Sequence, residues 1–139
     1  MSQTAILWPM IAHVALVFII YMLLGWRRRT EMQSGSVRPD QFKLNRQEPD
    51  ASAVVANNLA NQFELPVLFH AGCLALFTTG GVSLLTAGLA WLFVLLRYVH
   101  AYVHVTSNDL RLRSPVFAVG FVVLAALWAV LALNLARAP

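Results

Sequence analysis

The sequence predicts an all-α integral membrane protein, a bundle of four transmembrane helices that forms a single domain over residues 1–139. The chain is 59% hydrophobic and only 12% charged, which is too apolar for a water-soluble domain of this length. Four apolar segments each approach the roughly 20 residues that a spanning helix needs. These segments cover about residues 6–26, 53–77, 82–105 and 115–135. They leave no chain for a separate soluble domain.

The boundaries between these segments follow from local signals. No basic residue precedes the first segment and three arginines follow it, which indicates a retained helix rather than a signal peptide. The polar stretch over about residues 27–52 predicts a loop. Gly80-Gly81 predicts a tight turn within residues 78–81, so the second and third segments should be antiparallel neighbours. Pro115 predicts the start of the fourth helix.

The basic residues concentrate in two connections. They are Arg27, Arg28, Arg29, Arg38, Lys43 and Arg46 in the first, and Arg111 and Arg113 in the third. Four crossings place both connections on one side, which the positive-inside rule makes cytoplasmic. Both termini then lie on the non-cytoplasmic side of the membrane. Topology and attraction to anionic lipid account for the net charge of +4, so we expect no nucleic-acid partner.

Two ionisable residues, Glu64 and Arg97, lie inside apolar segments. A charge near the bilayer centre costs about 2.5 to 3.5 kcal/mol on insertion scales, so such a residue usually faces a partner or a water-filled site. Each belongs to a polar stripe with helical spacing: Asn57, Asn61 and Glu64, and Arg97, His100 and His104. Counted inward at about 1.5 Å per residue, the stripes lie at matching depth. We therefore expect a Glu64–Arg97 ion pair, which is either a structural clamp or part of a site.

Residues near the fourth segment favour a site. Arg113 and Ser114 lie beside the stripes on the cytoplasmic side, just before Pro115. An arginine next to the free N–H groups of a helix N-terminus is a good anion cradle. Asn108 and Arg111 add polar groups to the same region.

Several other residues fit structural roles better. Pro66 should kink the second helix and free a backbone carbonyl near the stripes. His13 and His70 are expected to form hydrogen bonds within the bundle, since their spacing matches no metal motif. Cys73 lies among apolar residues and is expected to pack there, so we predict neither a metal site nor a catalytic thiol.

Taken together, the motifs Asn61-Gln-Phe-Glu64-Leu-Pro66, Arg97-x-x-His100 and Arg113-Ser114 resemble those of the MAPEG family, the membrane-associated proteins of eicosanoid and glutathione metabolism. The resemblance covers all four segments and suggests a bacterial-type member. It implies a homotrimer of four-helix subunits, with glutathione bound as co-substrate between neighbouring subunits near the cytoplasmic helix ends.

The resemblance also implies a role for each residue of the site. Arg113 would stabilise the glutathione thiolate and Ser114 would contact the thiol. The remaining residues would bind glutathione, with Arg97 paired to Glu64: Asn57, Asn61, Glu64, Arg97, His100 and His104. Two positions carry a different residue from the family pattern, since well-characterised members have an arginine where this chain has Asn57 and commonly a tyrosine where it has His104. Pro66 also lies closer to Glu64 than the proline of those members.

The leading function predicted from the sequence is a glutathione transferase or peroxidase that acts on a lipophilic electrophile entering from the bilayer. The alternative is a non-catalytic membrane scaffold or lipid-binding protein. Arg113 separates these two readings, because a catalyst needs that cation within reach of the thiol. A small transporter is disfavoured because no second charged helix repeats the pattern.

Overall fold

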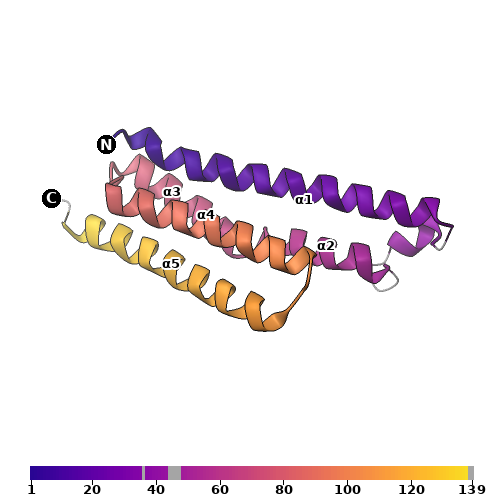
Figure 1. The fold of residues 1–139 in the computed structure, drawn as a ribbon. Coiled ribbons are helices and arrows are strands. Elements are labelled where there is room, and N and C mark those ends of the chain that lie inside the picture. Colours follow the sequence, from indigo (N-terminus) through magenta and orange to yellow (C-terminus); the bar gives the residue numbers. More distant parts are fainter. Residues whose placement is uncertain (36, 44–47, 138–139) are drawn as a thin grey trace.

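The computed structural model describes residues 1–35, 37–43 and 48–137, and the described part is helical throughout its regular elements. In chain order these elements are the 3-10 helix η1 (Gln3–Ile6), α1 (Leu7–Gln33), the 3-10 helix η2 (Pro39–Lys43), α2 (Asp50–Asn61), α3 (Leu65–Thr78), α4 (Leu84–Val105) and α5 (Leu110–Arg137). Helices α2 and α3 follow one another in a single column, so four helical columns lie side by side (Figure 1). The predicted all-α class is confirmed.

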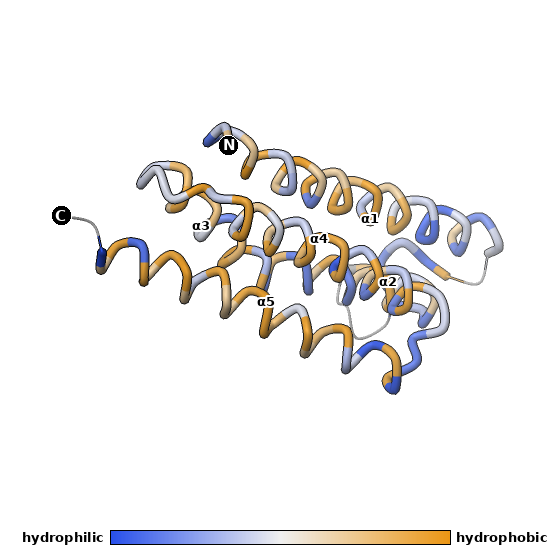
Figure 2. Tube along the Cα trace, turned by 60° about the vertical axis from the view of Figure 1, so that its left-hand side comes forward, coloured by the Kyte–Doolittle hydropathy of each residue, from blue (hydrophilic) through white to orange (hydrophobic). Residues whose placement is uncertain are grey.

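Three helices are long and apolar enough to cross a membrane. They run over Gln3–Gln33, Leu84–Val105 and Leu110–Arg137. The fourth column divides into α2 with 12 residues and α3 with 14, and neither alone reaches the roughly 20 residues of a span. Hydrophobic residues line the columns, and hydrophilic residues gather where α1 leads to α2 and α4 leads to α5 (Figure 2).

The connections have the predicted arrangement. Both termini lie at the same end of the bundle as the α3–α4 turn, and the other two connections lie at the opposite end (Figure 1). The turn uses Gly80 at a φ of +68°, a conformation that favours glycine. Ser83 then caps α4 in a reciprocal capping box with Thr86.

Helix α1 continues beyond the predicted end near Trp26 as far as Gln33, so its three arginines are helical. Arg28 reaches into the first connection. Its Nε and Nη2 lie 2.7 and 2.9 Å from the two carboxylate oxygens of Glu48, and its guanidinium carbon lies 5.5 Å from the centre of the Phe42 ring. The Glu48 side chain is 1% exposed. These contacts fasten part of the connection to α1, while Arg46 lies outside the described residues.

Two apolar clusters form the core. The first contains Phe69 stacked on Phe93 with ring centres 4.7 Å apart, and Cys73 is buried in it, as predicted. The second lies nearer the α1–α2 connection and consists of Leu16, Ile20, Leu24, Val55, Leu59 and Ala101. On α1, at the end of α2 and on α4, buried polar residues lie between the clusters: His13, Gln62, Arg97 and His100. This polar layer is where the candidate site lies.

Candidate functional site

The column formed by α2 and α3 breaks at Gln62, Phe63 and Glu64. Pro66 has no N–H to offer the carbonyl of Gln62, and it lies in the first turn of α3, where proline is tolerated. The last turn of α2 tightens instead, because the Gln62 and Phe63 amides donate to carbonyls three residues earlier, at 3.0 and 2.9 Å. The predicted kink is therefore a complete interruption of the helix.

The break frees the carbonyl of Asn61, as expected. The Nη2 of Arg97 donates to this oxygen at 3.1 Å and to the side-chain oxygen of Gln62 at 3.2 Å. Arg97 is only 3% exposed, so its guanidinium is buried in the bundle. Its hydrogen bonds supply a partner to the freed carbonyl, which a backbone group inside a membrane requires.

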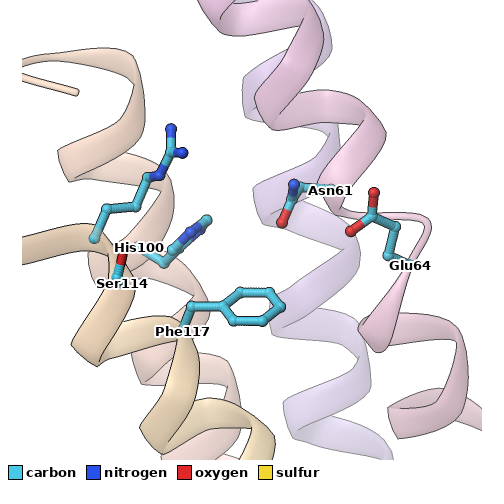
Figure 3. Close-up of a pocket in the computed structure, with 6 residues that line it drawn as sticks. Asn61, Glu64, His100, Ser114 and Phe117 are labelled. Carbon is cyan, nitrogen blue, oxygen red and sulfur yellow. The ribbon is translucent and has the colours of Figure 1, made fainter. Parts of the chain in front are cut away.

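The break opens onto a cavity of about 260 Å³. Six residues line it: Asn61, Glu64, His100, Arg113, Ser114 and Phe117. Asn61 and Glu64 face His100, Ser114 and Phe117 across the opening (Figure 3). Five of these six residues belong to the set predicted from the sequence. Phe117 was missed, although it lies one helical turn after Arg113 and so shares a face with it.

The predicted Glu64–Arg97 ion pair is wrong. The two described residues Glu64 and Arg97 form no ion pair with each other, and Arg97 instead donates to the Asn61 carbonyl and the Gln62 side-chain oxygen. Counting residues inward along each segment placed Glu64 and Arg97 at the same depth, and both do lie near the helix break. It could not show that Glu64 lies in the helix break, where its side chain is exposed at the cavity and not paired with Arg97.

Comparison with known proteins identifies the family. The sequence model of the MAPEG family matches residues 5–133, which is almost the whole chain. The chain belongs to the MAPEG family. No curated protein and no solved structure matches it. Membership is consistent with a glutathione-related function in the membrane.

The two departures from the MAPEG pattern lie away from the cavity. Asn57 is exposed on α2. His104 is 5% exposed, and its Nδ1 lies 3.2 Å from the Nδ2 of Asn58. The expected match in depth between Asn57 and His104 therefore gives no contact, because α2 is rotated so that Asn58, and not its neighbour, points into the bundle. Neither departure alters the six residues that line the cavity.

The start of α5 in this MAPEG protein differs from the prediction. The helix begins at Leu110, so Pro115 lies inside it and Arg113 lies in its first turn. The Oδ1 of Asp109 accepts from the backbone N–H of Arg111 at 2.8 Å, and the Asp109 backbone carbonyl accepts from the N–H of Arg113 at 2.9 Å in the first helical hydrogen bonds. The expected anion cradle of free N–H groups is therefore partly occupied by the chain itself, and Arg113 supplies the positive charge mainly through its side chain.

The Arg113 guanidinium is held in place by a second residue that the motifs did not identify as its partner. Its Nη1 donates to the Oδ1 of Asn108 at 2.6 Å. Asn108 has a φ of +49°, a left-handed conformation that asparagine tolerates better than most residues. This contact from the α4–α5 connection holds the guanidinium of a residue that lines the cavity.

The two walls of the cavity differ in charge. One wall offers the Glu64 carboxylate and the Asn61 amide, and the other offers Arg113 with the Ser114 hydroxyl. His100 lies beside them, and its Nδ1 is buried with no hydrogen-bond partner among the described residues. A buried nitrogen of this kind usually requires a partner from water or a ligand. The described residues contain no group of three His, Cys, Asp or Glu side chains that would hold a metal ion.

Proposed function

We propose that this protein binds glutathione in the cavity and transfers it to, or uses it to reduce, a lipophilic electrophile that enters from the bilayer. The observation that carries the proposal is the cavity itself, where Ser114 and His100 face Asn61 and Glu64 and where Arg113 is a further lining residue. A peptide thiol carries carboxylate, ammonium and amide groups, and the two walls present groups that complement all three.

The chemistry rests on the charge of Arg113. When a thiol loses its proton, a guanidinium beside the sulfur stabilises the thiolate, which is the nucleophile. In the transferase reaction the sulfur forms a bond to the electrophilic carbon, and the leaving group or opened ring takes up a proton. Ser114 can donate a hydrogen bond to the same sulfur. Asn61, Glu64 and His100 bind the peptide, while Asn57, Arg97 and His104 act from outside the cavity.

The assembly and location are parts of this proposal. A homotrimer would let a neighbouring subunit close the open side of the cavity, where Glu64 is exposed. The basic residues at the end with the α1–α2 and α4–α5 connections support a cytoplasmic position for the cavity mouth, in a bacterial inner membrane. Glutathione would then arrive from the cytoplasm and the electrophile from the lipid.

A lipid-binding scaffold is the second candidate, and one observation favours it. A separate cavity of about 390 Å³ opens between α1 and His70. Its other lining residues are apolar: Leu7, Met10, Ile11 and Val14. Such a surface suits an acyl chain and requires no thiol chemistry.

Titration of glutathione into the purified protein separates the two candidates. We expect the wild type to bind glutathione and to show the ultraviolet absorbance of the thiolate. In Arg113→Ala this absorbance should fall about tenfold or more, since a neighbouring cation lowers the pKa of an acidic group by about 1 to 3 units. Arg111→Ala is the matched control, because Arg111 lies in the same helical turn but does not line the cavity. Binding without a thiolate signal, or a full signal in Arg113→Ala, would support the scaffold.

A further inference from the structure

Gln62 lies next to the cavity but does not line it, and it makes the largest set of side-chain hydrogen bonds at the break. It is 2% exposed. Its Oε1 accepts from Nη2 of Arg97 at 3.2 Å and lies 3.3 Å from Nε2 of His13. Its Nε2 donates to the Oδ1 and the backbone oxygen of Asn58, at 3.1 and 3.2 Å. An amide has two acceptor and two donor positions, so Gln62 uses its full capacity.

These bonds fix the direction of a longer chain of hydrogen bonds. Because Oε1 of Gln62 can only accept, Nε2 of His13 must donate to it. The Nδ1 of a neutral His13 is then an acceptor, and it lies 3.1 Å from Nε2 of His70. On the other side, Oδ1 of Asn58 accepts from Gln62, so its Nδ2 donates to His104. The chain thus runs from His70 to His104 with Gln62 at its centre.

Gln62 therefore joins the helix break to three helices at one point. His13 comes from α1, Asn58 from α2 and Arg97 from α4. The same Nη2 of Arg97 also binds the carbonyl of Asn61, so one guanidinium nitrogen holds both the side chain of Gln62 and the backbone beside it. Asn61, the residue before Gln62, and Glu64, two residues after it, line the cavity.

We propose that Gln62 is a positioning residue for the thiol site, which fixes the interrupted backbone so that Asn61 and Glu64 face the cavity. This inference rests on the proposed function for the nature of the ligand. Gln62 acts through its neighbours, because its own side chain points into the bundle toward His13, Asn58 and Arg97. A helix end with freed carbonyls has many conformations unless such contacts select one.

The test compares Gln62→Met with Tyr98→Phe in the full protein. Methionine has a similar length but makes none of the four hydrogen bonds. Tyr98→Phe is the matched control, since it removes one bond between α4 and α1, from the Tyr98 hydroxyl to the Ala12 carbonyl at 2.8 Å, without touching the break. Glutathione affinity by calorimetry, oligomer size, thermal unfolding and amide hydrogen exchange over residues 62–67 are measured for each.

We expect Gln62→Met to weaken glutathione binding about tenfold or more and to speed exchange over residues 62–67, since each lost hydrogen bond changes an equilibrium severalfold. The Tyr98→Phe variant should bind glutathione within about twofold of the wild-type affinity, even if its melting temperature is as low as that of Gln62→Met. If Gln62→Met does not fold, Gln62→Glu replaces it. That variant keeps the acceptor for Arg97 but cannot donate to Asn58, so we expect a loss of about threefold.

The outcomes separate this inference from the proposed function. If the wild type does not bind glutathione, the proposed function fails, and faster exchange confined to residues 62–67 in a Gln62 variant still supports the positioning role. If a folded Gln62 variant keeps both the affinity and the exchange rates of the wild type, the positioning role is overturned. An equal loss of affinity in Tyr98→Phe would overturn it as well, because general destabilisation would then explain the effect.

Discussion

Replacing Arg97 by leucine tests how the buried guanidinium is paired. The change removes two hydrogen bonds, to the Asn61 carbonyl and to Gln62, each worth about 1.5 to 3 kcal/mol for a charged donor. Part of this is returned, because the guanidinium is no longer buried and its Nε has no partner among the described residues. We expect a net loss of about 2 to 4 kcal/mol in the free energy of unfolding.

Glu64 should contribute far less to stability. It is exposed, and no described basic side chain forms an ion pair with it. We expect Glu64→Gln to change the free energy of unfolding by less than about 0.5 kcal/mol. The double variant should then behave additively, with a coupling energy below about 0.5 kcal/mol between the two sites.

The assay is denaturation of the four proteins in mixed detergent micelles, followed by the fluorescence of the four tryptophans. The two single variants, the double variant and the wild type complete the thermodynamic cycle. A coupling energy above about 1 kcal/mol would show that Glu64 and Arg97 touch in the assembled protein. In that case the conclusion that Glu64 and Arg97 form no ion pair would be wrong.

Two further predictions concern packing and pH. Gly72→Ala should destabilise the α3–α5 contact by about 1 to 3 kcal/mol, because the added Cβ would lie only 2.9 Å from the Cδ2 atom of the buried Leu127. The same denaturation assay measures this loss. The hydrogen bond from Arg28 lowers the pKa of Glu48. The pair therefore contributes its full stabilisation of the first connection at pH values above the ordinary glutamate pKa of about 4.3, and this contribution is lost as the pH falls through the lowered pKa. The protection of amides over residues 37–43, measured as the exchange rate relative to the intrinsic rate at the same pH, should therefore fall at acid pH, and Glu48→Gln should lower it at neutral pH.

The sequence could predict the columns and their connections because these depend on hydropathy and local turn chemistry. The stretch ending near Thr78, the turn at Gly80 and a kink near Pro66 all follow from residues that act on their own neighbourhood, although the kink is in fact a full interruption of the helix. The hydrogen bonding of His13 and His70 was also predicted, and the two rings lie within 3.1 Å through Nδ1 and Nε2.

The rotation of α2 could not be predicted in the same way. Polar residues stand in adjacent pairs, at positions 57 and 58 and at positions 61 and 62, so two neighbouring stripes have equally good helical spacing. The choice between them is made by His13, Arg97 and His104, which are distant in sequence. The start of α5 was misplaced for a related reason: Pro115 resembles a first-turn proline, but Asp109 had already capped the helix.

The interruption at Gln62–Glu64 also affects how the chain enters a membrane. Helices α1, α4 and α5 each have the length and hydropathy to insert alone, whereas α2 and α3 do not. We therefore expect the second column to be stabilised in lipid by its neighbours, through the short turn to α4 and the packing of α2 on α1. We then expect insertion of this column into the membrane to be coupled to assembly of the cavity. The same contacts, such as those of Gln62 with His13 of α1 and Arg97 of α4, hold the column to its neighbours and complete the polar layer.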